Sequence, residues 1–498
     1  MPCNFTRRDF MKSSLYGLSL AAFPGQHAAA QTFRQRLDWE DFKVSRHYAS
    51  FLDAIGKMRA NTNASDKRSW LYWTNAHVTY CPHSFAYFLA WHRGYLYYFE
   101  QQLRAISGNN ALTLPYWDYY KNPVIPAEFT NPASWNPLYI QRVNTDVTQA
   151  LTLAPFADNV TNMQRGLVNA FETSLESMPH NPVHNIIGGV MSDMQSPLDP
   201  IFWVHHANID RLLSAWVAAD NGRIMPARTD VYWNGNFTYS TKLTLRRNMT
   251  VDTRTDMGYF YQNETLPTAL PPTVLAEPVQ LAMAGNAGKL AMLGSPASGE
   301  QPLLPKRPPL GNFSLSGPRP TGIQRRSIGG VRQMALNEHA VSARIPVNTQ
   351  EKQGVQSVLK KMTAPPFGRA DTSLGPHTSI QVVLDNVRNT PLGASGGYFY
   401  KIYLNLPLKA DATESEEKYL LGNLGPFQVA GARHHVGANN NAGVQLVFPA
   451  TQLLQNLTSE DLNELTVSFV RISGNNSPAG DAIKIGELRI EVSTDDVE

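Results

Sequence analysis

Apolar residues recur in the first half of the chain at the spacing of an α-helix. They stand three or four positions apart between residues 39 and 60, and similar patterns occur in four later stretches: 69–79, 85–106, 163–177 and 199–218. Several prolines interrupt residues 121–160 and predict loops there. We therefore expect residues 31–263 to form a mainly helical bundle.

After residue 330 the apolar residues form short runs that are typical of strands. The run Tyr398–Leu404 partly alternates, and turn-forming residues separate it from the other runs, which are 372–386, 444–448, 465–472 and 483–492. This regular spacing predicts an antiparallel β-sandwich or jelly roll over residues 331–498. The predicted fold class is therefore multidomain α and β, with an N-terminal helical bundle and a C-terminal antiparallel β-sandwich.

The stretch between these two parts has little periodicity. Residues 264–330 are rich in Gly, Pro, Ala and Ser, which predicts an extended linker. Two dibasic pairs, Lys306-Arg307 and Arg325-Arg326, are expected to be exposed in it and open to proteolytic nicking.

The first 30 residues have the pattern of an export signal. The stretch Thr6–Lys12 contains a twin-arginine motif, a modest apolar segment follows, and Ala28–Ala30 is a typical cleavage site. We expect the Tat translocase to export the folded protein to the periplasm or out of the cell. The apolar segment is too short and too polar for a stable membrane span, and no other segment resembles one.

Composition narrows the function only slightly. The chain has 498 residues, of which 42% are hydrophobic and 17% charged, and its net charge is +3. This length allows two or three domains, and the charge is too small to indicate a nucleic acid or an anionic membrane as partner. Cys3 leaves with the signal, so Cys81 is the one cysteine of the mature chain and no internal disulfide is expected.

Histidines form two groups within the helical part. The first has three members within sixteen residues, among aromatic side chains: His77, His83 and His92. In the second, His180 and His184 are i, i+4 neighbours, and His205-His206 follows the helix start at Asp199-Pro200. An isolated histidine is usually a core residue, but two sets of three imidazoles indicate a dinuclear metal site. Copper, zinc, iron and nickel all suit such ligands.

These motifs resemble the two copper-binding regions of tyrosinases, catechol oxidases and haemocyanins, the type-3 copper proteins. Trp91-His92-Arg93 is similar to the first region, and the stretch Asp199–Arg211 to the second. The resemblance implies two copper ions, bound by His77, His83, His92, His180, His184 and His206. His206 is preferred to its neighbour His205 because it stands four residues before Asp210. For the first ligand, His47 is a weaker alternative to His77.

The resemblance also assigns roles around the copper ions. Cys81 is expected to form a thioether with the ring of His83, and the alternative is a buried free thiol. Glu176 and Asn181 are expected to hold a water that deprotonates a phenol, unless Glu176 is merely an exposed helix carboxylate. Glu172 lies one helical turn before Glu176. Three further residues are expected near the site: Met194 as a gate, Phe202 over the pocket, and His205 beside the ligands.

The C-terminal part resembles the shielding domain of plant polyphenol oxidases. We expect a loop near Leu424–His435, or Tyr398, to plug the pocket. The implied activity is ortho-hydroxylation of monophenols and oxidation of o-diphenols to o-quinones with O2, so the partners are phenolic and catecholic small molecules. The alternatives are a catechol oxidase without hydroxylase activity and a haemocyanin-like oxygen carrier. A binding module with a dead site is disfavoured because all six histidines are present.

Overall fold

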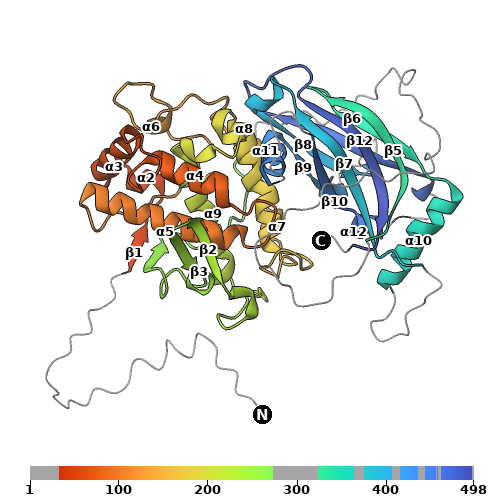
Figure 1. Cartoon of the computed structure of the whole chain (residues 1–498), viewed down its shortest axis with the longest axis horizontal. Coiled ribbons are helices and arrows are strands. Elements are labelled where there is room, and N and C mark those ends of the chain that lie inside the picture. Colours follow the sequence, from red (N-terminus) through yellow and green to blue (C-terminus); the bar gives the residue numbers. More distant parts are fainter. Residues whose placement is uncertain are drawn as a thin grey trace, which may run out of the picture. The chain divides into compact units, whose positions relative to one another are not determined.

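The computed structural model describes residues 33–272, 323–363, 375–406, 416–435, 443–455, 457 and 461–495. The predicted signal, most of the predicted linker and Lys306-Arg307 lie outside these residues. The described residues form a helical part and a part built of β-sheets (Figure 1). Each part has a large hydrophobic core. Among the described residues, no helix is both long and apolar enough to cross a bilayer.

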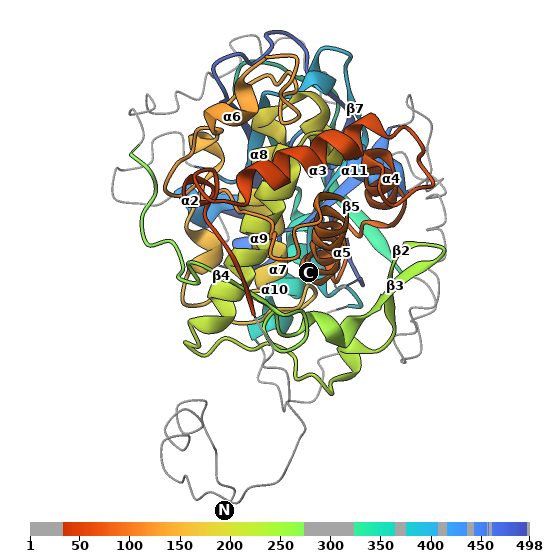
Figure 2. The ribbon, with the colours of Figure 1, turned by 90° about the vertical axis from the view of Figure 1, so that its left-hand side faces the viewer.

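Helices build the first part, as the apolar spacing predicts. They are α2 (Trp39–Phe42), α3 (Tyr48–Ala60), α4 (Trp70–Tyr80), α5 (Phe88–Ser107), α6 (Ala127–Thr130), α7 (Phe171–Leu175), α8 (Asn181–Ile187) and α9 (Ile201–Ala218). The long helix α5 packs against both α3 and α9 (Figure 2). Its last turn ends at Gly108, whose left-handed conformation (φ 68°) stops the helix.

Two predicted helices are shorter than expected. The stretch 39–60 is divided because Ser45 accepts a hydrogen bond from the amide of His47 and so competes with helix formation. The stretch 163–177 is helical only over α7, because Gly166 and Asn169 both have positive φ. A five-residue turn, Glu176–His180, then connects α7 to α8, with the non-helical Met178 inside it.

Short strands complete the helical part. The parallel pair of β1 (Arg34–Arg36) and β4 (Tyr259–Tyr261) joins its two ends, and β2 (Asn236–Ser240) and β3 (Leu243–Arg246) form a hairpin. Residues 114–118 lie beside this pair, where the amide of Tyr116 donates to the carbonyl of Leu37.

Two four-stranded antiparallel sheets build the C-terminal part. One has the order β10-β7-β12-β5 and the other β6-β11-β8-β9. The strands are β5 (Arg325–Leu336), β6 (Val341–Pro346), β7 (Ser379–Asn389), β8 (Tyr398–Leu404), β9 (Leu420–Leu424), β10 (Val444–Pro449), β11 (Glu464–Ser473) and β12 (Ile483–Ser493). Three helices, which the strand pattern did not predict, accompany them: α10 (Thr349–Thr363), α11 (Pro426–His435) and α12 (Thr451–Leu454).

The β part begins earlier than predicted. Strand β5 starts at Arg325, so the last six residues of the predicted linker belong to a sheet. Its glycines suggested a linker, but a Cβ atom at Gly330 would stand 2.4 Å from the carbonyl oxygen of Leu488 on β12. The glycine therefore allows a close approach of two strands. Arg325 pairs with Glu491 (3.7 Å), so the prediction of a freely exposed dibasic pair there was wrong.

Candidate metal centre

The first histidine group joins two helices and the turn between them. His77 lies on α4, His92 on α5 and His83 in the connecting turn, and all three are buried. Their ring centroids are 5.0–5.7 Å apart. The Nδ1 atoms of His77 and His92 donate to the carbonyl oxygens of Met194 (2.8 Å) and Phe88 (2.9 Å). The Nε2 atom of each of these two rings is therefore unprotonated and keeps the lone pair that can bind a metal.

The second group joins α8 to α9. The Nε2 atom of His206 on α9 lies 3.3 Å from that of His180 and 3.4 Å from that of His184. His184 donates from Nδ1 to the carbonyl of Met191 (2.8 Å), and Nδ1 of His180 contacts Oδ1 of Asn181 (2.9 Å). Three ring nitrogens thus converge on one point, an arrangement that suits a cation placed between them.

The two groups face each other. The rings of His92 and His206 stack with centroids 4.2 Å apart, and His83 lies 5.9 Å from His180. Burial lowers the pKa of five of the ligand histidines, all except His83, to about 3 for His92 and His184. These five rings are therefore neutral near pH 7. Six imidazoles in two buried groups, with no carboxylate among them, fit a pair of copper ions.

His205 is closer to the second group than the sequence suggested. One of its ring nitrogens lies within 4.8 Å of the ligand atoms of His180, His184 and His206. Among the described residues, neither ring nitrogen has a hydrogen-bond partner. The ring stacks on His180 (5.4 Å, 22°) and lies near Tyr119 (5.7 Å). His206, whose Nε2 atom lies at the point of convergence, nevertheless has the better ligand geometry. The competing His47 lies outside both groups and bonds with Asn109.

A buried ion-pair network ties the two ligand helices together. Oδ1 of Asp210, on α9, accepts from Arg93 of α5 (2.5 Å), and its other oxygen accepts from Tyr259 and Tyr261 (2.6 Å each). Burial alone would raise the pKa of Asp210, but Arg93 and Arg36 hold it below its usual value. Since Arg93 follows a ligand and Asp210 stands one turn after another, the network aligns both groups.

Cys81 lies within reach of the first group. Its Sγ atom is 3.7 Å from Nε2 of His83 and 3.4 Å from Nε2 of His92. The thiol is buried, and burial raises its pKa. The neutral sulfur thus lies beside the ring of His83, with which the thioether is expected.

Two carboxylates hold the turn that carries His83. Glu176 accepts a hydrogen bond from the amide of Ser84 (2.7 Å). Glu172 accepts from the amides of Tyr87 (3.2 Å) and Leu89 (3.1 Å). Ser84 and Tyr87 both have positive φ, so these bonds stabilise an unusual backbone. Burial raises the pKa of both acids, to about 7 for Glu172.

Arg165 is a member of this cluster that the sequence did not suggest. Its guanidinium pairs with the carboxylate of Glu176. The predicted reading of Glu176 as an exposed helix carboxylate is therefore wrong, because the residue is buried in an ion pair.

The predicted gate and cover residues both lie against the ligand histidines. Met194 is buried, and its carbonyl contacts His77 of the first group. Phe202 is also buried, with its ring 4.1 Å from that of His206 and 5.1 Å from that of His77. It supports the ligand rings from within the core.

A side chain of the C-terminal part covers the histidines. Phe427, on α11, stacks on His184 (4.1 Å, 14°) and meets His83 edge-on (5.1 Å), and it is 2% exposed. A residue of the predicted plug segment 424–435 therefore lies against the histidines, and most of this segment is the helix α11 instead of a loop. Tyr398, the other predicted plug, donates its hydroxyl hydrogen to Gly393 within the β part.

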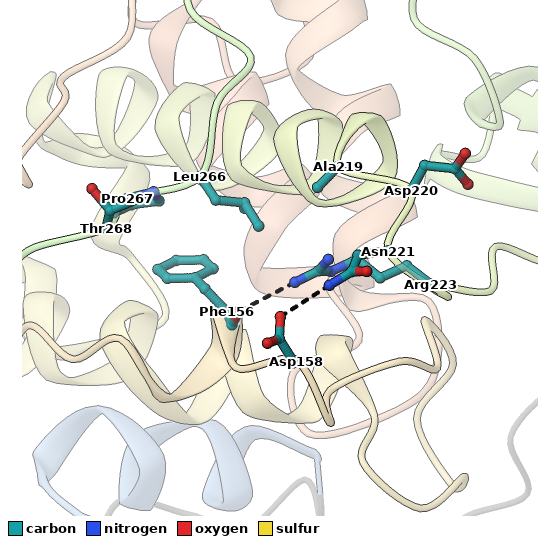
Figure 3. Close-up of a pocket in the computed structure, with 9 residues that line it drawn as sticks. All are labelled: Phe156, Asp158, Ala219, Asp220, Asn221, Arg223, Leu266, Pro267 and Thr268. Carbon is teal, nitrogen blue, oxygen red and sulfur yellow. Dashed lines mark hydrogen bonds between the residues drawn. The ribbon is translucent and has the colours of Figure 1, made fainter. Parts of the chain in front are cut away.

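A surface pocket lies elsewhere, at the end of α9. Its polar groups bond to one another: Arg223 donates to the carbonyl of Phe156 (3.2 Å) and Asn221 to Asp158 (3.1 Å) (Figure 3). None of the residues lining it belongs to the histidine groups.

The family of the helical part follows from its sequence. Residues 49–165 and 127–219 match the model described as the common central domain of tyrosinase, and residues 328–493 match a domain of unknown function, DUF7868. The fold and the two facing histidine groups define a protein with a dinuclear copper site. The helical part of the chain is thus similar to the central domain of tyrosinases.

Individual relatives cover part of the chain. Tyrosinase HcTyr1 of Hahella sp. is 37% identical over 175 residues, which are 28% of this chain and 38% of that protein. The latent polyphenol oxidase of Prunus armeniaca is 26% identical over 35% of this chain and 38% of its own length. Hemocyanin G-type of Enteroctopus dofleini is 32% identical over 29% of this chain. The chain thus matches less than half the length of these relatives.

The whole fold has a structural counterpart. The structure of latent apple tyrosinase superposes with a TM-score of 0.50 and 18% identity, covering 93% of this chain and 97% of that one. This likeness concerns the fold and includes both the helical and the β part.

Proposed function

We propose that this protein oxidises o-diphenols to o-quinones with O2 and hydroxylates monophenols ortho to their hydroxyl group. The observation that carries the proposal is the pair of facing histidine groups, whose neutral rings direct Nε2 atoms inward. A copper pair bound there supplies the electron exchange with O2.

The chain's own residues prepare the phenol. We assign Glu176 as the general base, acting through a water that it holds together with Asn181. The phenolic O–H bond breaks, the proton passes through the water to the carboxylate, and the electron pair stays on the phenolate oxygen. The supporting observation is that Glu176 is buried four residues before His180, while Asn181 directly follows that ligand and contacts its ring.

Two alternatives differ in the reactions they allow. A catechol oxidase would share the ligands and oxidise only o-diphenols, whereas an oxygen carrier would turn over neither substrate. Oxygen uptake by the copper-loaded protein, with tyrosine and separately with L-DOPA, distinguishes them. We expect uptake with both; uptake with L-DOPA alone would contradict the hydroxylase assignment, and reversible O2 binding without turnover would contradict both oxidase assignments.

The covering phenylalanine supports a latent enzyme. We infer that Phe427 excludes phenols until the β part is displaced, because its ring occupies the face of His184 that a flat aromatic substrate would need. Nicking within the predicted linker, for example at Lys306-Arg307, followed by displacement of the β part would activate the enzyme. An unchanged rate after nicking and separation of the two parts would contradict this inference.

Two further proposals concern maturation. A thioether between Cys81 and the ring of His83 would form as the S–H bond and one ring C–H bond break, with loss of two protons and two electrons that would reduce O2 to hydrogen peroxide. The mature protein should then be lighter by the mass of two hydrogen atoms, whereas Cys81→Ala should not show this loss.

We also propose that the protein is exported by the Tat route. Cleavage after the alanine triplet, and loss of export when the twin arginines are replaced by lysines, would support this proposal.

A further inference from the structure

Arg165 approaches the proposed base from the solvent side. Its guanidinium pairs with one oxygen of the Glu176 carboxylate, and the amide of Ser84 donates to the other at 2.7 Å. The Arg165 side chain is 18% exposed and that of Glu176 is 2% exposed. The cation therefore reaches inward to a buried acid and lies outside the histidine groups.

The charge balance around Glu176 depends on this one cation. Glu172 is also buried, and it lies so close to Glu176 that repulsion from the Glu176 charge helps to raise the pKa of Glu172. The neutral thiol of Cys81 also faces Glu176. Among the described groups that act on Glu176, Arg165 is thus the one whose positive charge stabilises the ionised carboxylate. Two buried carboxylates beside each other do not both remain ionised without such compensation.

The loop that carries Arg165 is fixed at its base. The amide of Phe171 donates to the carbonyl of Asn162 (2.7 Å), and the side chain of Asn162 donates to the carbonyl of Val168 (2.7 Å). The amide of Arg165 itself donates to Glu172 (3.4 Å). The loop therefore presents the guanidinium in one place instead of letting it move freely in solvent.

We propose that Arg165 is a positioning residue that keeps Glu176 ionised and oriented as a base, and thereby sets the rate of monophenol hydroxylation relative to o-diphenol oxidation. The proposal rests on the proposed function of Glu176. A protonated Glu176 is too weak a base to take the phenolic proton. An o-diphenol reacts without a hydroxylation step and so depends less on this acid.

Four variants test the proposal: Arg165→Gln, Arg165→Lys, Glu176→Gln and the double variant Arg165→Gln/Glu176→Gln. In Arg165→Gln we expect kcat/KM for tyrosine near pH 7 to fall about tenfold relative to that for L-DOPA, and to recover at higher pH. Arg165→Lys keeps the cation and should restore most of the ratio. Because Arg165 acts through Glu176, the double variant should be no slower than Glu176→Gln alone.

An infrared measurement on the metal-free protein needs no turnover. Near pH 7, Arg165→Gln should show the carbonyl absorption of a protonated carboxyl group that is missing from the double variant. Subtracting the two spectra removes the contribution of Glu172. Unfolding curves of the same samples identify any variant that has lost its fold. If Arg165→Gln is unfolded, Arg165→Lys is compared with the wild type instead.

The outcomes separate this inference from the proposed function. A wild-type protein that oxidises L-DOPA but not tyrosine would overturn the hydroxylase assignment, while the infrared band would still test the ionisation of Glu176. An unchanged substrate ratio together with no additional carboxyl band in Arg165→Gln would overturn the inference. Equal losses with both substrates, not rescued by lysine, would also overturn it, because they indicate a purely structural role.

Discussion

Backbone carbonyl groups select the protonation form of several ligand rings. His77, His92 and His184 each donate from Nδ1 to a carbonyl oxygen, so the tautomer is set by the main chain. Because the acceptors are main-chain atoms, the hydrogen bonds do not depend on the side chains of Met194, Phe88 and Met191. This arrangement also leaves the inward nitrogen of each ring ready to bind a metal without a change of tautomer.

The adjacent histidines on α9 should differ in their effect on copper binding. His206→Gln removes the nitrogen at the point of convergence, so we expect the protein to lose one of its two copper ions. His205→Gln, the matched control, should keep both. Metal analysis of purified protein measures the copper content. Loss of copper in His205→Gln with full content in His206→Gln would reverse the assignment.

Residue identities in the site were largely predictable from local motifs. His83 and His92 are close in sequence and bedded in aromatic residues, and the His206–Asp210 spacing distinguished between two neighbouring histidines. Arg165 could not be found in this way. It meets Glu176 because an irregular loop folds back, and such a loop has no periodic pattern.

At the level of elements, the periodicity of apolar residues predicted where helices occur better than it predicted where each helix begins and ends. Apolar periodicity predicted the ligand helices α4, α5 and α9, whereas α8 was indicated only by the i, i+4 spacing of His180 and His184. The breaks after Phe42 and before α7 were missed because they depend on side-chain hydrogen bonds and positive φ values. Strand β5 was missed for a related reason: its glycines serve close strand packing instead of flexibility.

The turn after His83 makes stability depend on pH through Glu172. Burial raises the pKa of Glu172 to about 7, so from pH 4.5 to 7 the folded state holds a proton that the unfolded state has lost. This acid therefore lowers the free energy of unfolding as pH rises, by about 3 kcal/mol over that range. The buried histidines act in the opposite direction, because their folded pKa values are lowered and the unfolded state binds more protons.

Glu172→Gln isolates the contribution of the acid. We expect the unfolding free energy of the metal-free variant to rise more steeply between pH 5 and 7 than that of the wild type. Urea unfolding at several pH values measures the difference. Parallel curves would contradict the raised pKa, and Glu264→Gln, at an exposed ion pair, is a suitable control.

At the scale of the whole molecule, polar groups join the β part to the metal centre. Asn185, beside a ligand, accepts from the amide of Phe427 (2.9 Å) and donates to Gln428 (2.8 Å). Asn423 donates to the carbonyl of Ser177 (3.2 Å), next to the turn that contains Glu176. The net contribution of each such hydrogen bond to stability is modest, about 1 kcal/mol, which is compatible with the proposed displacement of the β part.

Removing the covering ring should activate the intact chain. Phe427→Ala deletes the stack on His184, and loss of about 1.4 kcal/mol would raise the accessible fraction about tenfold. We expect a similar rise in L-DOPA oxidation before any proteolysis. Tyr398→Phe, which removes a hydroxyl bonded within the β part, should leave the rate unchanged. Equal rates for wild type and Phe427→Ala, with equal copper content, would show that this ring does not limit access.

The carbonyls of Met191 and Met194 have a consequence for how the two halves of the centre stay matched. These atoms belong to one short stretch of chain, yet they hold His184 of one group and His77 of the other. The number of peptide units between the two carbonyls therefore sets the separation of the two histidine rings. The side chains of this stretch can vary, but an insertion or deletion of a single residue would move both halves of the centre at once.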